Sequence, residues 1–359
     1  MKRFYPAIIT ACIGLLLGGV VGMTFYQATL IAFFIGMWSV CILSSLESSM
    51  SLDNSVVASS ILVTMSEQWQ KRYLTWGMLI AVFGMRFAFP ILIVSFSAHI
   101  SPLKTLVMAV HSPEQYGNIL ESIHPEINAF GISFLLMISL SYFMNQDKNE
   151  HWLGFIEKPL AKIGRMTSLP AVISLIVTLC YSHKVSHEHT YSVLTAGIIG
   201  VVAFFLIKQG LPLLLGEDPT QIKSGTGGLG TFMYLECVDA SFSFDGVIGA
   251  FAITNNIFII AIGLGVGAMV VRCLTLWLVE LKKKSLDSQN EEDAELDLPF
   301  TRFLENGAFF SVFALIICMY YNEPDYITGL CGIIILTAAS LCGVYLKEEK
   351  EKEDLAYKE

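Results

Sequence analysis

The sequence predicts an all-α protein, a polytopic bundle of transmembrane helices. Of its 359 residues, 54% are hydrophobic and only 15% are charged, whereas an average soluble domain carries roughly 25% charged residues. Apolar stretches of spanning length, about 20 residues, recur along the whole chain. We therefore expect the lipid bilayer to surround most of this protein.

Ten apolar segments can be placed as membrane spans. Segment 28–64 is too long for one straight span, so it either projects from the bilayer or breaks. Segment 168–182 is short, which leaves open whether it crosses fully. We expect residues 1–346 to form one transmembrane domain and residues 347–359 to form a charged cytoplasmic tail. The expected spans are 6–26, 28–64, 74–98, 127–145, 168–182, 191–214, 229–254, 256–280, 303–321 and 326–346.

The basic residues predict the orientation of these spans. Cytoplasmic loops of membrane proteins are enriched in Lys and Arg. Counting spans places the pairs Lys71–Arg72 and Lys2–Arg3 on one side together with the run Lys282–Lys284, whereas the opposite loops hold only Lys104 and Lys184. We therefore predict that both termini are cytoplasmic.

Two segments carry carboxylates directly beside apolar sequence. Glu47–Ala58 reads ESSMSLDNSVVA, and Glu236–Asn256 reads ECVDASFSFDGVIGAFAITNN. Each contains an acidic residue six positions before an Asp, namely Glu47 before Asp53 and Asp239 before Asp245. Ionisable residues inside a membrane are costly, so they indicate a functional site.

These two segments also predict an inverted repeat. The span count directs the first segment from outside to inside and the second from inside to outside. An arginine follows one span later in both cases, Arg86 and then Arg272. Oppositely directed repeats place their ion sites near the bilayer midplane. We expect the first repeat over about 28–145 and the second over about 229–321.

Both acidic segments are expected to be broken helices. At 100° per residue, two acids six positions apart do not share one face of a straight helix. Either the helix is locally unwound or the acids face one cavity from two angles, and broken helices commonly frame ion sites. The serines of both segments could satisfy the backbone groups that unwinding frees.

The charge balance of the segments favours a hard divalent cation. Each bare carboxylate in hydrocarbon costs at least about 2.5–3.5 kcal/mol on insertion scales, and the charge partners Arg86 and Arg272 can neutralise only two. Oxygen-rich sites suit Mn²⁺, Mg²⁺ or Ca²⁺, whereas zinc or copper is disfavoured because the segments hold no His and only Cys237. The predicted ligands are Glu47, Asp53, Asn54, Asp239 and Asp245, and further candidates are Glu236, Asn255, Asn256 and Glu305.

A second group of ligand-type residues lies in a predicted external loop. His183, His187 and His189, in the stretch HKVSHEH, could gather a metal ion, but a solvated loop is the favoured interpretation. The eight cysteines contain no CxxC pair, so they are expected to be small apolar residues.

These motifs resemble the TerC (tellurium-resistance) family of bacterial integral membrane proteins, and within it a branch catalogued as a domain of unknown function. The branch pattern YLE-x2-DASFSFDGVIGAFAIT corresponds to Tyr234–Thr254, and Trp76–Pro90 and Ala129–Met137 fit it as well. Where the pattern has Glu-His-Gly-Ala, this chain reads Glu305, Asn306, Gly307, Ala308. The resemblance implies metal-ion transport in a bacterial inner membrane, with Mn²⁺ export the activity of the wider family.

The leading functional hypothesis is therefore a secondary transporter that exports a divalent cation, with Mn²⁺ favoured, driven by protons or the membrane potential. The alternative is a non-transporting membrane scaffold of a metal or tellurite stress-response complex, with structural acids. We do not expect an enzyme, because no nucleophile–base arrangement is present. The expected partners are the lipid bilayer and the metal ion; a homo-oligomer is compatible with the sequence, and no nucleic acid is expected.

Overall fold

The computed structural model confirms the all-α bundle. It describes residues 4–26, 29–77, 79–145, 151–164, 166, 168–210, 227–254, 256–287, 291–323 and 325–358. Within these ranges the regular structure is helical, and the single β-bridge, between Met65 and Gly227, belongs to no strand.

Seven of the described helices are long and apolar enough to cross a membrane. Two shorter apolar helices, Phe83–Phe96 and Leu169–Lys184, lie in two further expected spans, and a third, Leu52–Thr64, lies in the expected span 28–64 together with Leu30–Met50. A multi-pass membrane protein is thus supported, while ten crossings stay a prediction. The seven long helices are Tyr5–Phe25, Leu30–Met50, His124–Phe143, Thr190–Lys208, Ile257–Lys283, Phe303–Tyr321 and Ile327–Tyr345.

The elements follow one another as helices joined by short connections. In the first half they are α1 (Tyr5–Tyr26), α2 (Leu30–Met50), α3 (Leu52–Thr64), α4 (Glu67–Arg72), η2 (Tyr73–Gly77), η3 (Ile80–Ala88), α5 (Phe89–Ser97), α6 (Pro102–His111), α7 (Pro113–Ser122), α8 (His124–Phe143) and α9 (Gly154–Ile163). In the second half they are α10 (Leu169–Lys184), α11 (Thr190–Phe205), η4 (Leu206–Gly210), α13 (Leu229–Ile253), α14 (Ile257–Asp287), α15 (Glu291–Tyr321) and α16 (Asp325–Lys358). The η segments are π-helical.

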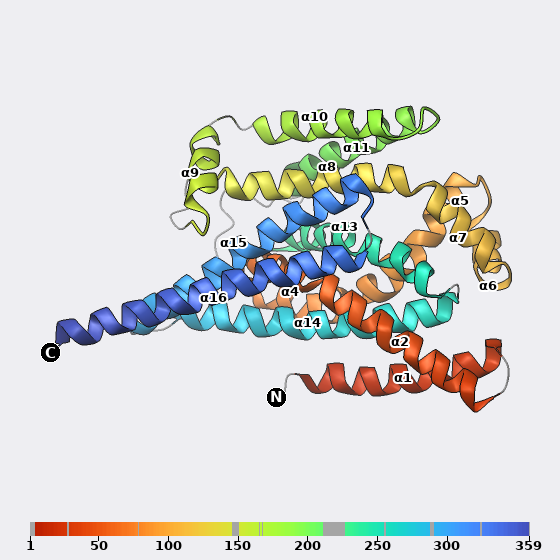
Figure 1. The fold of residues 1–359 in the computed structure, drawn as a ribbon, viewed down its shortest axis with the longest axis horizontal. Coiled ribbons are helices and arrows are strands. Elements are labelled where there is room, and N and C mark those ends of the chain that lie inside the picture. The colour runs from red at the N-terminus through yellow and green to blue at the C-terminus, as the bar shows by residue number, and fades with distance from the viewer. Residues whose placement is uncertain are drawn as a thin grey trace.

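The long helices run along one common direction (Figure 1). The short helices α6 and α7 lie together at one end of the bundle, and α9 lies across the opposite end. Helix α1 begins on the side away from α6 and α7, and α16 ends on that same side. The two chain ends therefore face the same end of the bundle.

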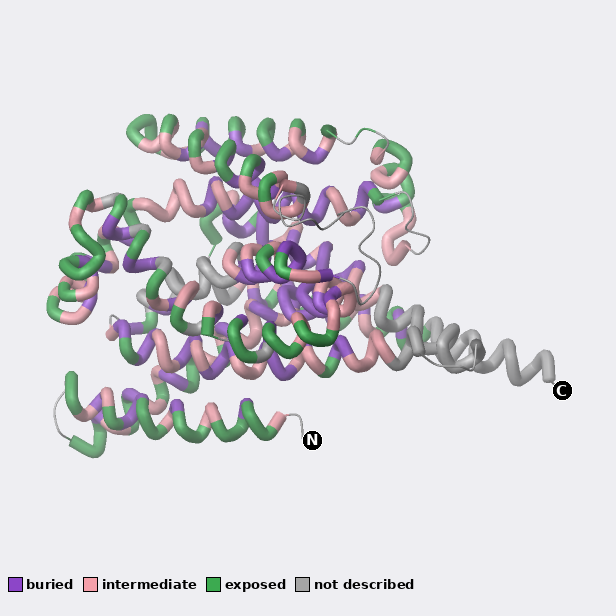
Figure 2. Tube along the Cα trace, turned by 180° about the vertical axis from the view of Figure 1, so that it is seen from behind, coloured by how far each residue is buried: buried purple, intermediate pink, exposed green. Residues whose placement is uncertain are grey.

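Burial follows the pattern of a protein in lipid. Buried residues gather in the middle of the bundle, and exposed positions follow the outer faces of α1, α2 and α10 (Figure 2). Large apolar side chains occupy those outer faces, with Ile31 72% and Trp38 67% exposed. In contrast, α8 is buried along most of its length, from Asn128 to Leu140. The apolar exterior is consistent with surrounding hydrocarbon.

Glycines allow the helices around the candidate site to approach closely. A Cβ on Gly36 of α2 would come within 2.1 Å of the carbonyl oxygen of Gly18 on α1. A Cβ on Gly267 of α14 would come within 2.5 Å of the Glu47 Cβ. Small residues at such crossings are typical of membrane helix packing, and here they bring α1 and α14 against the helix that carries Glu47.

Candidate cation site

The two acidic segments meet inside the bundle, where α13 packs against α2 and α3. Glu47 is 1%, Asp53 5%, Asn54 1% and Asp239 6% exposed. Four predicted ligands from the two halves of the chain are thus buried together, away from the apolar exterior.

The first acidic segment breaks at Ser51, as predicted. Helix α2 ends at Met50 and α3 begins at Leu52, with Ser51 between them at φ −100° and ψ 13°. The Ser51 hydroxyl donates to Glu47 Oε1 over 3.1 Å, and its N–H donates to the Glu47 carbonyl. Asp53 consequently lies in the first turn of α3, where the partial positive charge of a helix N-terminus favours a carboxylate.

The second acidic segment differs from the expectation. Helix α13 runs without interruption from Leu229 to Ile253, through both Asp239 and Asp245. The chain leaves the helix only at Thr254, and α14 starts at Ile257. The expected break within this segment is therefore wrong, because the described helix is continuous through the positions of both acids.

Asn54 joins the two acidic segments directly. Its amide Nδ2 donates to Asp239 Oδ1 over 2.6 Å, across 185 positions of sequence. The neighbouring Asp53 accepts from the Asn54 backbone N–H over 2.8 Å and from the Ser311 hydroxyl of α15 over 3.0 Å. Asp53, Asn54 and Asp239 thereby form one polar cluster between α3, α13 and α15.

Glu47 is bound to its predicted charge partner. The guanidinium of Arg86, on the π-helical segment η3, donates to Glu47 Oε1 as a buried ion pair. Arg86 also donates to the Ala81 carbonyl over 2.7 Å. Helix irregularities of the π type are frequent at functional sites. The pair neutralises Glu47, so this carboxylate has less need of a cation than Asp53 or Asp239.

Arg272, the second predicted charge partner, contacts Tyr73 instead of a carboxylate. Its Nη1 donates to the Tyr73 carbonyl over 3.0 Å, and its guanidinium lies 3.7 Å from the centre of the Tyr73 ring. Glu236 lies nearby and is 3% exposed, and its two carboxylate oxygens have no hydrogen-bond partner in the described part of the structure.

The described interior therefore holds more buried carboxylates than buried arginines at this site. Glu47, Asp53, Glu236 and Asp239 face only Arg86 and Arg272. Within the described residues, Glu47–Arg86 is the direct ion pair of this group. A buried charge without a partner is expensive, so the cluster has a net demand for positive charge.

The remaining predicted ligands fall into two groups. Asn255 and the side chain of Asp245 lie outside the described part of the structure. Two others have structural roles: Asn256 Oδ1 accepts from the N–H groups of Phe258 and Ile259 and so caps α14, and Glu305 pairs with Lys282 over 3.1 Å. Among the described side chains, no three of His, Cys, Asp or Glu are grouped closely enough to hold a metal ion.

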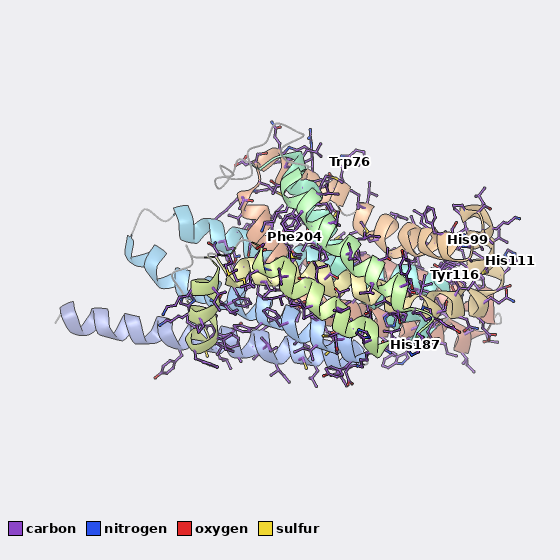
Figure 3. The ribbon with its side chains drawn as sticks, turned by 90° about the horizontal axis from the view of Figure 1, so that it is seen from above. Trp76, His99, His111, Tyr116, His187 and Phe204 are labelled. Atoms are coloured by element: carbon purple, nitrogen blue, oxygen red, sulfur yellow. The ribbon has the colours of Figure 1, made fainter. Side chains whose placement is uncertain are left out.

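The histidines lie away from the acidic cluster. His187 lies at the α6–α7 end of the molecule with His99 and His111 (Figure 3), and it is exposed. His189 Nδ1 lies 2.7 Å from Glu126 Oε1 at the start of α8. The loop, which connects α10 to α11, therefore contacts the start of α8, while His183 and His187 are exposed.

Sequence reasoning did not identify Ser311, Tyr73 or Gly77 as contributors to the site. Ser311 could have been noticed as a hydroxyl inside an apolar span, but its bond to Asp53 crosses 258 positions. No sequence pattern indicated Tyr73 or Gly77, because Tyr73 contacts Arg272 of α14 and Gly77 lies beside Glu236 of α13 only in the folded protein. Asn306, which departs from the family pattern, accepts from the Tyr142 hydroxyl over 2.8 Å.

Comparison with known protein families gives one match. A family model described as "Protein of unknown function (DUF475)" matches residues 52–350. This range includes Asp53, Arg86, Asp239 and Arg272 and leaves Glu47 outside. Comparisons with curated proteins and with solved structures found no match.

Proposed function

The chain belongs to the family of proteins of unknown function DUF475, and from its buried site we propose that it is a secondary transporter that exports a divalent metal cation. The observation that carries the proposal is the surplus of buried carboxylates over arginines between α3, α13 and α14. A cation that enters this region is attracted by charges that the protein leaves uncompensated.

The oxygen chemistry of the cluster favours a hard cation. Asp53, Asn54 and Asp239 present carboxylate and amide oxygens, which Mn²⁺, Mg²⁺ and Ca²⁺ prefer. Asn54 Oδ1 is buried and accepts no hydrogen bond in the described structure, so it is available as a neutral ligand. Asp245 is assigned to the same site on the basis of its motif.

Mn²⁺ is the favoured ion because of the resemblance to the TerC family, whose wider activity is Mn²⁺ export. In this proposal the protein lies in a bacterial inner membrane with both termini cytoplasmic. The shared side of the α1 start and the α16 end supports a common location for the termini, and the basic loops assign that side to the cytoplasm. Export is driven by protons or by the membrane potential.

The proposal is tested with purified protein in proteoliposomes that contain a pH-sensitive dye. Mn²⁺, Ca²⁺, Mg²⁺ and Zn²⁺ are offered in turn, and metal uptake and internal pH are recorded together. We expect Mn²⁺ to be transported and Zn²⁺ to be disfavoured. Metal movement equal to that of protein-free liposomes for all four ions would contradict a transport function.

A scaffold function is favoured by one observation, the Glu47–Arg86 pair. That pair links α2 to η3 as a structural lock, which is what acids of a non-transporting scaffold would do. The surplus carboxylates Asp53, Glu236 and Asp239 have no such explanation, and for this reason transport is the stronger proposal.

A further inference from the structure

Glu236 stands apart from the other buried acids. It lies on α13 three residues before Asp239 and is 3% exposed. Both of its carboxylate oxygens are shielded from solvent and accept no hydrogen bond in the described part of the structure. An unsatisfied buried carboxylate is rare in native proteins and calls for an explanation such as an unseen ion.

The adjacent arginine does not provide that explanation. Arg272 directs one guanidinium nitrogen to the Tyr73 carbonyl and stacks on the Tyr73 ring. A Cβ added to Gly77 would lie 2.4 Å from Glu236 Oε1 and 2.9 Å from Arg272 Nη1. The two charged groups therefore flank the same point, and the missing side chain of Gly77 leaves room for them both.

The charged and titratable groups that face Glu236 come from each element around it. They are Arg272 on α14, Arg86 on η3, Asp239 on α13 and Tyr73 on η2. Arg86 is already bound by Glu47. Asp239 offsets the charge of Arg272, so the single negative charge of Glu236 is left for one monovalent cation to balance.

We propose that Glu236 is the binding position of a monovalent coupling cation, H⁺ or Na⁺, that exchanges with the divalent cation at the Asp53–Asn54–Asp239 cluster. This inference rests on the proposed transport function. Glu236 and Asp239 are three residues apart, so they are neighbours on one helix face. A bound H⁺ or Na⁺ cancels the negative charge of Glu236 and so weakens the attraction of a divalent ion to Asp239, and each ion therefore favours release of the other.

The coupling is tested with Glu236→Gln in proteoliposomes. The variant should lose the proton or Na⁺ flux that accompanies Mn²⁺ transport in the wild type. Glu157→Gln is the matched control. Glu157 lies on α9 and is also buried, but its carboxylate accepts a hydrogen bond from the Leu153 N–H at the start of that helix. The control should keep both the Mn²⁺ flux and the proton or Na⁺ flux. A proton or Na⁺ flux in Glu236→Gln equal to that of the wild type would overturn the inference.

A binding measurement separates this inference from the transport proposal and distinguishes the two ions. Purified wild type and Glu236→Gln are compared in detergent without divalent metal, by radioactive Na⁺ binding and by acid–base difference titration. The wild type should bind one more Na⁺, or one more proton, than the variant. Identical behaviour in both assays would overturn the inference even if Mn²⁺ transport is found, and a positive result would stand even if Mn²⁺ transport is absent. Thermal unfolding of the variant should be no earlier than in the wild type, because the change removes a buried charge.

Discussion

The buried pair between Glu47 and Arg86 gives the sharpest stability prediction. Glu47 is 1% and Arg86 4% exposed. Arg86→Met removes the cation and keeps a long apolar side chain. Glu47 then retains only the Ser51 hydroxyl, at 3.1 Å. Removing one partner of a buried ion pair costs about 3–5 kcal/mol.

This cost corresponds to a change of about 100-fold to a few thousand-fold in the unfolding equilibrium, since about 1.4 kcal/mol is a factor of ten. The assay is denaturant unfolding in detergent, followed by helix content. The double variant Glu47→Gln/Arg86→Met should recover most of the loss, because neither charge is then left without a partner. Arg72→Met, which removes an exposed arginine 4.4 Å from the Trp69 ring, should cost only about 0.5–1 kcal/mol. A single Arg86 variant as stable as the wild type, or a double variant as unstable as the single, would refute this reasoning.

Three further predictions concern packing and the outer polar contacts. Gly267→Ala should destabilise by about 1–3 kcal/mol through overpacking, because its Cβ would lie 2.5 Å from Glu47 Cβ and 2.9 Å from the Ser44 carbonyl oxygen; Gly84→Ala, whose nearest neighbour is 3.5 Å away, should not destabilise in the same unfolding assay. Tyr142→Phe should cost about 1–3 kcal/mol, since Asn306 is buried and loses a 2.8 Å bond; an unchanged unfolding midpoint would count against that bond. Glu305→Gln should leave Mn²⁺ flux unchanged and cost at most about 1 kcal/mol, because its pair with Lys282 is partly exposed; loss of flux would restore Glu305 to the site.

The membrane fold and the broken first segment were predictable from sequence. Apolar runs report hydrocarbon contact directly, and a run of 37 residues from 28 to 64 is too long for one straight span. The acids within that run marked where it would break, and Ser51 is the break. The second segment has a comparable pattern of acids and small residues, yet α13 is continuous. Whether a helix breaks depends on the tertiary partners of its backbone, which local sequence does not specify.

The residues of the site were predictable, but their pairing was less so. The motifs predicted that Asp53, Asn54 and Asp239 belong to one site, and the structure has a hydrogen bond between Asn54 and Asp239. The pattern treated Arg86 and Arg272 as equivalent, whereas one binds Glu47 and the other binds the Tyr73 carbonyl. Such differences arise from side-chain geometry between helices distant in sequence, which no spacing rule encodes.

The central claim, a divalent-cation site built from the carboxylates of the two acidic segments, is tested most directly by Mn²⁺ flux in proteoliposomes containing Asp53→Asn or Asp245→Asn, with thermal unfolding of the same preparations. Each substitution keeps the side-chain volume and removes one negative charge from the proposed site. We predict that flux is lost while the unfolding midpoint is maintained, because an uncharged side chain is less costly within a membrane span. Normal Mn²⁺ flux through stable, correctly inserted variants would contradict the site, and parallel loss of flux and stability would indicate a structural role for these acids.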